Sequence, residues 1–263
     1  MYIGATDTSL TSGAWVIEDG AMRQRDVPRN EGWHKSVGEI ADNAFDNRVR
    51  GTNKVDVSIG ENGSITVSNN GETIAVMKHE TETDKYNPSV VFGELCCSGQ
   101  YDSTDANANV VGQNGFGAKL TNIHSTWFEV VCHDPVNGSF KQTFTDNMKT
   151  AGPPKITKPK KKPFSTVIKF KLDNSAFKLS ASDLQAQHAL LHTDLVRRAA
   201  LFPGVKVSFN GKLIQVRSFD KFAKLFPVRK PVSLKINDVL TVSFGMADEP
   251  GHQSFVNGHY TSG

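Results

Sequence analysis

The sequence predicts an α/β protein that is built from β-hairpins and amphipathic helices in two consecutive units. Three observations support this class. Residues 54–68 and 205–214 each alternate at period two around a short turn that contains Asn-Gly, as β-hairpins do. Residues 33–50 carry apolar side chains at the three-and-four spacing of a helix with one buried face. The composition shifts near Leu179, so we expect the boundary between the two units there.

The bulk composition excludes several classes of protein. The chain has 263 residues, 38% of them hydrophobic and 22% charged, which is typical of a globular protein with ample core. No apolar run approaches the roughly 20 residues that a membrane span needs, and the first residues lack the pattern of a signal peptide. The formal net charge of +3 is only a weak indication of acidic partners. Three cysteines without zinc-like spacing favour a reducing, intracellular compartment, so we do not expect a secreted or membrane-bound protein.

The N-terminal elements are expected in the following order. Residues 14–18 and 22–27 flank the turn residues Asp19 and Gly20 and predict a first hairpin. The helix over residues 33–50 should end near Gly51. The hairpin over residues 54–68 then runs directly into Asn69-Asn70-Gly71, which would place side-chain amides at the edge of a sheet.

The polar face of the first helix has an unusual composition. At about 100° per residue, Glu39, Asn43 and Asp46 fall on one side, opposite the apolar stripe. Asn and Asp are poor choices in mid-helix, because their side chains compete for backbone hydrogen bonds. A solvated polar face is the commoner explanation for such a pattern. A carboxylate with amides one turn further on would also suit a general base, a metal ligand or the binding of a polar ligand.

A glycine-rich segment follows a long polar stretch. Residues 77–110 are poorly periodic except at 90–92, and a long irregular stretch in a compact domain is often a functional lid. Residues 111–123 then contain three glycines followed by Ala118, Lys119 and a helix start. Such a segment can cradle an anion with backbone N–H groups and a lysine ammonium, although a flexible turn is the commoner explanation. The pattern does not match a P-loop.

Three further strands are expected to complete the first unit, at residues 127–131, 139–144 and 166–170. Between the last two, residues 153–163 hold five lysines and four prolines, a composition that should exclude regular structure. We interpret this segment as an exposed loop in preference to a DNA-contacting element.

The second unit should begin with a helix. Ser180 and Asp183 can cap a helix that runs to about Phe202. The hairpin over residues 205–214, a short helix over 219–226 and strands over 240–244 and 253–256 follow. No terminating element is expected after that.

Several motifs, taken in order, resemble the signature of the GHKL ATPases. They are Glu39 with Asn43, then Asn69-Asn70-Gly71, then the glycine segment from Gly112 to Lys119. The order and the residues of these motifs are similar to those in the ATPase region of type IIA DNA topoisomerases, particularly the eukaryotic and large-virus kind. The similarity extends over nearly the whole chain. Further matching segments are Tyr2-Ile3-Gly4, residues 91–93 and 98–101, residues 196–199, 207–211 and 254–257.

The resemblance implies a fold and a division into domains. Residues 1–179 would form a two-layer α/β sandwich of the GHKL (Bergerat) type with a mixed sheet, which binds ATP. Residues 180–263 would form the N-terminal part of a transducer domain, a second α/β unit.

The resemblance also implies site residues. Glu39 would be the general base that deprotonates the attacking water, and Asn43 would hold Mg²⁺. Asn47 and Asn69 would line the nucleoside pocket and Thr166 would support adenine. Ser98 and Gln100 would lie near the ribose. The remaining expected ATP-binding residues are Asp46 and those of the triphosphate loop: Asn114, Gly115, Phe116, Gly117, Ala118 and Lys119.

The function that follows is an ATP-binding and ATP-hydrolysing module of a type II topoisomerase, with ATP and Mg²⁺ as cofactors. The implied partners are DNA, a second copy on ATP binding and the breakage-reunion region, and the implied location is a compartment that contains DNA. The chain ends before the family's lysine that reaches the γ-phosphate, so we expect slow hydrolysis and weak dimerisation from this chain alone. Residues 72–75 depart from the family pattern, which would weaken nucleotide binding. Alternatives are a mismatch-repair or chaperone-like GHKL ATPase, or a nucleotide-sensing DNA clamp without efficient turnover.

Overall fold

The computed structural model describes residues 3–94 and 117–261 of the chain and divides it into two compact units. The first comprises the residues up to Asp7 together with Asn30–Leu179, and the second comprises Thr8–Arg29 together with Ser180–Gly263. The sequence places residues 1–179 in one domain, whereas the structure groups the first hairpin with the second unit. The two units are described separately below.

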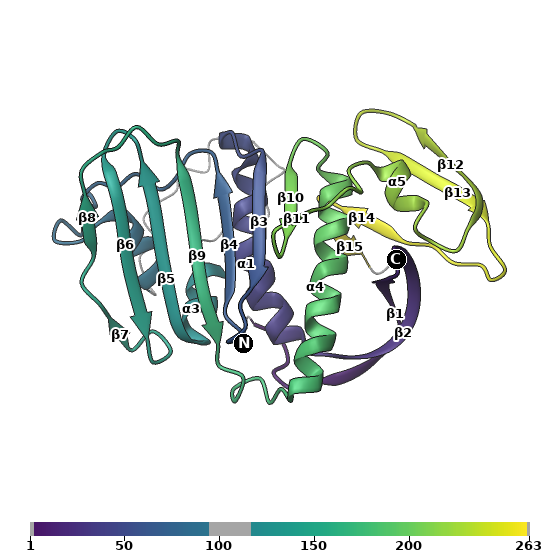
Figure 1. Cartoon of the computed structure of the whole chain (residues 1–263), viewed down its shortest axis with the longest axis horizontal. Coiled ribbons are helices and arrows are strands. Elements are labelled where there is room, and N and C mark those ends of the chain that lie inside the picture. The colour runs from purple at the N-terminus through teal and green to yellow at the C-terminus, as the bar shows by residue number, and fades with distance from the viewer. Residues whose placement is uncertain (1–2, 95–116, 262–263) are drawn as a thin grey trace. The chain divides into compact units, whose positions relative to one another are not determined.

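The first unit is built on an antiparallel sheet (Figure 1). Its strands lie in the order β3-β4-β9-β5-β6-β7, and β8 also pairs with β6. Every pairing between these strands is antiparallel. The bounds are β3 (Lys54–Ile59), β4 (Ile65–Asn70), β5 (Ser125–Asp134), β6 (Gly138–Thr145), β7 (Thr150–Ala151), β8 (Lys155–Thr157) and β9 (Ser165–Leu172).

The described helices of the first unit cover one face of this sheet (Figure 1). The helices are α1 (Glu31–Asp46), the 3-10 turn η1 (Asn47–Arg50), α2 (Asn87–Gly93) and α3 (Gly117–Ile123). α1 packs on β4, while α2 and α3 pack on β5. This arrangement confirms the predicted two-layer α/β sandwich.

The helix α1 forms where the apolar periodicity predicts it. Asn30 caps its N-terminus by accepting a hydrogen bond from the Trp33 backbone N–H at 2.9 Å. The predicted apolar stripe is fully buried against the sheet: Trp33, Val37, Ile40, Ala41, Ala44 and Phe45. Burial of this stripe stabilises the helix by far more than its intrinsic propensity, because apolar area removed from water contributes roughly 25 cal/mol per Å².

An aromatic cluster forms the centre of the sandwich. The ring of Phe128 on β5 lies 6.2 Å from that of Phe92 on α2, 6.4 Å from Phe144 and 6.1 Å from Phe170. These rings join the helical layer to the middle of the sheet and stabilise the packing of the two layers.

The prediction for residues 153–163 was wrong in part. Lys155–Thr157 form the strand β8, which pairs with β6. A three-residue strand at the edge of a sheet tolerates flanking prolines, because they do not have to donate into a ladder on both sides. Residues 158–164 do form an exposed connection.

A second difference concerns residues 77–110, where the sequence predicts irregular structure. α2 spans Asn87–Gly93 there and starts with Pro88 in its first turn, a position that suits proline. Val90 and Phe92 are buried, so tertiary packing stabilises a helix that is too short for a clear periodic pattern.

In the second unit, the structure confirms the predicted hairpins and both helices. The capping box of Ser180 and Asp183 starts α4 as expected, with hydrogen bonds in both directions. The strands β12 and β15 were not predicted. The bounds are β1 (Ser9–Glu18), β2 (Ala21–Arg29), α4 (Ala181–Leu201), β10 (Lys206–Phe209), β11 (Lys212–Leu213), α5 (Phe219–Ala223), β12 (Arg229–Lys235), β13 (Thr241–Met246), β14 (Ser254–Val256) and β15 (His259–Thr261).

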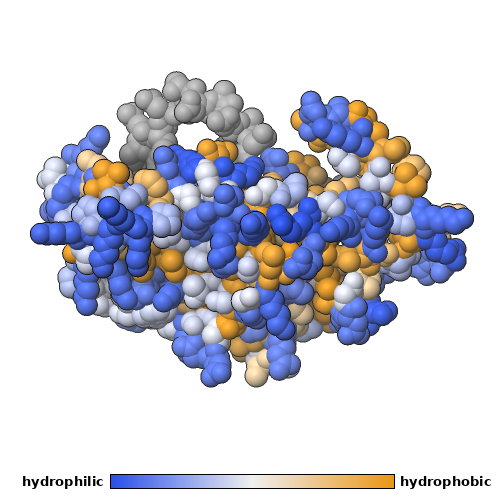
Figure 2. Space-filling model, turned by 45° about the horizontal axis from the view of Figure 1, so that its top comes forward, coloured by the Kyte–Doolittle hydropathy of each residue, from blue (hydrophilic) through white to orange (hydrophobic). Residues whose placement is uncertain are grey.

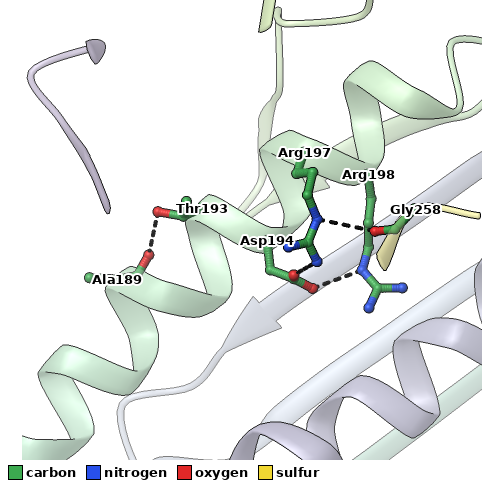
Figure 3. Close-up of polar contacts among 6 residues, drawn as sticks. All are labelled: Ala189, Thr193, Asp194, Arg197, Arg198 and Gly258. Carbon is green, nitrogen blue, oxygen red and sulfur yellow. Dashed lines mark hydrogen bonds and ion pairs between the residues drawn. The ribbon is translucent and has the colours of Figure 1, made fainter. Parts of the chain in front are cut away.

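The C-terminal end of α4 is tied to the turn between β14 and β15 (Figure 3). Asp194 accepts hydrogen bonds from both Arg197 and Arg198, its neighbours one helical turn away. The Nε of Arg197 also donates to the carbonyl of Gly258 at 3.1 Å. These hydrogen bonds therefore fix α4 against the β14–β15 turn inside the second unit.

Across residues 3–94 and 117–261, no helix has both the length and the hydropathy to cross a membrane.

Candidate functional site

The carboxylate of Glu39 lies on α1, in the first unit, at a place that is largely shielded from water. Its side chain is 17% exposed. The Lys35 ammonium, one helical turn earlier, approaches Glu39 Oε1 to 2.5 Å. This lysine is half exposed, so the pair is a surface-type ion pair that contributes little to stability. Its main effect is to hold the carboxylate in one place.

The start of α3 lies directly against this carboxylate. A Cβ placed on Gly117 would overlap Oε2 and the carboxyl carbon of Glu39, so only glycine fits here without displacing the acid. The hydroxyl of Thr121 on α3 donates to the Ser36 carbonyl on α1 at 2.8 Å. The N-terminal turn of α3 is therefore held beside Glu39 by the packing of two helices.

Ala118 and Lys119 occupy the first turn of α3 and are both buried, with Lys119 only 6% exposed. Asn122, at the far end of α3, donates from Nδ2 to the Phe92 carbonyl at 2.9 Å and so fixes α3 against α2. The predicted triphosphate loop thus ends in a rigid element.

Asn43 and Asp46 follow Glu39 along the same side of α1. The Asn43 side chain is exposed, whereas Asp46 is buried and pairs with the Arg48 guanidinium at 3.1 Å. Asn43 is therefore available to an incoming ligand, and Asp46 is engaged with the chain itself.

A second group of polar residues gathers where α1 ends and β4 ends. The hydroxyl of Thr52 accepts hydrogen bonds from the side-chain amides of Asn47 at 2.9 Å and Asn69 at 3.2 Å, and it donates to the Asn70 carbonyl. Asn47 also donates to the Glu72 carbonyl at 2.8 Å. Asn69 is 8% exposed, so its amide is oriented in a nearly dry environment.

Thr166 lies next to Asn69, because the two residues are partners in the register of β9 and β4. Its hydroxyl is 2.7 Å from the hydroxyl of Thr73. On the other side, Thr166 is paired with Cys132 of β5, and burial raises the pKa of the Cys132 thiol to about 12. The thiol is therefore a neutral packing group and not a nucleophile.

The structure brings together two groups of predicted site residues. Glu39, Asn43 and Gly117–Lys119 form one group, while Asn47, Asn69 and Thr166 form the other, and α1 with its following turn contributes to both. The other predicted ATP-binding residues lie outside the described residues: Ser98, Gln100, Asn114, Gly115 and Phe116.

Three further residues take part in the site and were not predicted. The i, i+4 spacing of Lys35 and Glu39 was a signal that could have found the ion pair. Thr73 lies in the segment that we treated only as a departure from the family pattern. Thr52 has no local sequence signal, because its importance comes from strands that are distant in sequence.

The donor set constrains which metal could bind. Among the described residues, no group of three or more His, Cys, Asp or Glu side chains is arranged to hold a metal ion. A hard cation such as Mg²⁺, however, commonly takes one or two protein oxygens and completes its shell with phosphates and water. The exposed amide of Asn43, one turn from Glu39, fits such a site.

Comparison with known proteins identifies relatives of the chain. No family model matches the sequence. The chain is 36% identical over 234 residues to DNA topoisomerase 2 of Trypanosoma cruzi, covering 86% of this chain and 19% of that protein. It is 36% identical over 269 residues to the probable DNA topoisomerase 2 of Dictyostelium discoideum, covering 97% of this chain and 17% of that protein. The chain therefore spans less than a fifth of these relatives.

A solved structure covers almost the whole of this chain. The ATPase region of Saccharomyces cerevisiae topoisomerase II superposes with a TM-score of 0.89 at 31% sequence identity, over 99% of this chain and 70% of that one. Both comparisons confirm the predicted resemblance and the GHKL type of α/β sandwich. The chain belongs to the family of type IIA DNA topoisomerases and corresponds to their ATPase region.

Proposed function

We propose that this chain binds ATP together with Mg²⁺ and hydrolyses the γ-phosphate. The main observation in favour is the contact between Gly117 and the Glu39 carboxylate, since it sets a candidate base against the end of a glycine-rich anion loop. Hydrolysis of ATP requires positioning and charge neutralisation more than covalent chemistry, and this arrangement supports the positioning.

Glu39 is the proposed general base. A base must lie within hydrogen-bond reach of the water that it deprotonates and must be held in place. The ion pair with Lys35 and the contact with Gly117 restrict the Glu39 side chain from two directions. The carboxylate therefore orients a water molecule and accepts its proton as that water attacks the γ-phosphorus, while the bond from this phosphorus to the bridging oxygen breaks and ADP leaves.

The proposed triphosphate site comprises Asn114–Lys119, whose backbone N–H groups would donate to phosphate oxygens at the start of α3. The Asn43 amide oxygen would hold the cation, which neutralises phosphate charge when it is bound. The nucleoside would lie toward Asn47, Asn69 and Thr166, with Ser98 and Gln100 near the ribose. The network around Thr52 supports this assignment, because it orients two of these side chains before any ligand arrives.

In the whole protein, the proposed role of the module is ATP-dependent passage of one DNA segment through another. Two copies would dimerise on ATP binding and act with a breakage-reunion region, in an intracellular compartment that contains DNA. Asp46 was also predicted to bind ATP, and its pairing with Arg48 supports an indirect role in which it positions the end of α1.

A second candidate function is nucleotide sensing without efficient turnover. One observation favours it: Thr73 stands in the segment that departs from the family pattern, and its hydroxyl is bonded to that of Thr166. A nucleotide that needs the Thr166 hydroxyl would have to replace this bond, which would weaken its binding.

Two measurements on the chain distinguish these functions. Calorimetric titration with a non-hydrolysable ATP analogue, with and without Mg²⁺, measures binding, and a phosphate-release assay with ATP measures turnover. Saturable, Mg²⁺-dependent binding together with turnover supports the proposal. Binding without turnover supports the sensor, and the absence of binding contradicts both.

A further inference from the structure

The solvent-facing side of the first unit's sheet concentrates lysines. In the strand register, Lys141 of β6 is paired with Lys155 of β8, and Lys169 and Lys171 project from β9 to the same face, opposite the helices. The connection from β8 to β9 adds four more. We call these eight residues the lysine face: Lys141, Lys155, Lys158, Lys160, Lys161, Lys162, Lys169 and Lys171.

Acidic residues do little to neutralise this face. The strands β6, β8 and β9 and the connection of residues 158–164 contain no Asp or Glu. Glu129 of β5 lies between two of the lysines, 2.7 Å from the Lys141 ammonium and 3.8 Å from that of Lys169. One carboxylate offsets one of eight ammonium groups, so the face keeps a large positive excess.

The lysines are accessible to a ligand. The side chains of Lys141 and Lys169 are 50% and 43% exposed in spite of their contact with Glu129. Residues 153–163 are exposed throughout. In the space-filling view, hydrophilic residues dominate the surface over this part of the first unit (Figure 2).

The connection is anchored at its start. The turn between β5 and β6 passes so close to the end of β8 that a Cβ on Gly138 would overlap the Thr157 carbonyl. Gly138 also has a φ of +113°, which only glycine adopts readily. The three consecutive lysines, Lys160–Lys162, are therefore displayed from a fixed point beside the sheet and do not hang from a free tail.

We infer that the lysine face binds the phosphate backbone of duplex DNA. This inference adds a surface to the DNA partner of the proposed function, but it does not depend on ATP chemistry. Duplex DNA carries one charge per roughly 1.7 Å and releases condensed counterions when lysines neutralise its phosphates. An acidic peptide has a lower charge density and no such counterion layer. Since the cluster consists of lysines without arginine, the contacts are point-charge contacts to phosphates and do not read sequence.

The test is DNA binding by the chain without nucleotide. A fluorescently labelled, mixed-sequence duplex of about 25 base pairs is titrated by anisotropy over a series of KCl concentrations. The test variant is Lys160→Gln/Lys161→Gln/Lys162→Gln. The matched control removes the same charge from exposed positions of the second unit, Lys221→Gln/Lys230→Gln/Lys235→Gln. All substitutions are on exposed side chains, and an unchanged midpoint of urea unfolding in each variant shows that the fold is intact.

We expect the test variant to lose at least about tenfold in affinity at 100 mM salt and to reduce the slope of log K against log salt by roughly 0.9 per lysine that contacts a phosphate. The control should stay within about twofold of the unaltered chain. Equal losses in both variants, salt-independent binding or no binding at all would overturn the inference. It would also be overturned if a polyglutamate peptide of equal charge competed as well as unlabelled duplex, because the face would then suit an acidic protein. If the chain bound DNA without ATP turnover, only the proposed ATPase function would fail.

Discussion

At the residue scale, the account depends on how closely two distant positions approach each other. The sequence predicts Glu39 on the polar side of a helix and Gly117 in a glycine-rich segment, but periodicity cannot show that they touch. The contact results from α3 packing on α1 through Thr121 and Ser36. The sequence did show that the polar face of α1 has an unusual composition. Asn and Asp have low helix propensity in mid-helix, so their presence there indicates a role other than helix formation.

Replacing Gly117 by alanine should slow ATP hydrolysis while the chain still folds. The new Cβ would overlap the carboxyl group of Glu39 and would lie 2.9 Å from the Glu39 Cβ, so the carboxylate must move aside and α3 must shift slightly from α1. The carboxylate then no longer occupies the position of the base. A displacement of about 1 Å at a catalytic group costs on the order of 10²-fold in rate. Steady-state phosphate release measures this loss of rate. Gly38→Ala on α1 is the matched control, since a Cβ there meets nothing within 4 Å and should leave turnover unchanged. Equal turnover in both variants would contradict the proposed position of the base.

A second residue-scale prediction concerns Asp134, the last residue of β5. Burial alone would raise the pKa of this carboxyl, but hydrogen bonds from Asn137 and from the backbone N–H groups of Val136 and Val76 lower it below its ordinary value. The folded state therefore binds this proton more weakly than the unfolded state. The resulting stabilisation is present above about pH 4 and is lost as the pH falls below that value.

Urea unfolding of the chain and of Asp134→Asn between pH 7 and pH 3 measures this effect. The difference in the free energy of unfolding between the two proteins should shrink as the pH falls. A difference that stays constant over this range would show that Asp134 is not linked to proton binding.

At the element scale, the sequence predicted the elements with a clear local pattern and missed those without one. Amphipathic periodicity found α1 and α4, and alternation around Asn-Gly turns found the hairpins β3–β4 and β10–β11. α2 and β8 were missed because each is stabilised by its neighbours in space and not by local preference. The proline- and lysine-rich composition that argued against β8 describes only the residues around it.

Asn30 shows how one residue can hold an element in place. Its side chain caps α1, and its Nδ2 also donates to the carbonyls of Thr6 at 2.7 Å and Phe177 at 2.9 Å. Because the residue is fully buried, Asn30→Ala would leave these partners unsatisfied and should lower the free energy of unfolding by about 2–4 kcal/mol. Denaturant unfolding measures the loss.

The exposed cap of α4 supplies the comparison for this prediction. Ser180→Ala should cost only about 1 kcal/mol, the usual value for an N-cap. If the two substitutions cost the same, Asn30 acts as a simple cap and not as a buried link between segments.

At the scale of the whole molecule, the chain consists of two compact units, and all of the described candidate nucleotide residues belong to the first. We therefore expect an ATP analogue to raise hydrogen-exchange protection in the first unit and to leave that of the second unit nearly unchanged. At 100 times its dissociation constant, a ligand stabilises the state that it binds by about 2.7 kcal/mol. Hydrogen exchange followed by unit-resolved mass spectrometry measures where protection rises. Equal protection of β12 and β13 would contradict the assignment of the site to the first unit alone.

The sequence could predict the family because the motifs are short, ordered and chemically distinctive. It could not predict that the Thr52 hydroxyl accepts hydrogen bonds from both Asn47 and Asn69, or that Thr73 contacts Thr166. These contacts join segments that are distant in sequence, and they depend on strand register. The lysine face was also hidden, because β6 and β9 are distant in sequence and only the connection of residues 158–164 was visible as a charge run.

The most direct test of the central claim compares Glu39→Gln with the unaltered chain in two assays, ATP turnover and binding of a non-hydrolysable ATP analogue. Glutamine keeps the size and polarity of the side chain but cannot accept the proton of the attacking water. We predict that turnover falls by at least about 10²-fold while the dissociation constant of the analogue changes less than about threefold. Retained turnover in Glu39→Gln would contradict the assignment of Glu39 as the base.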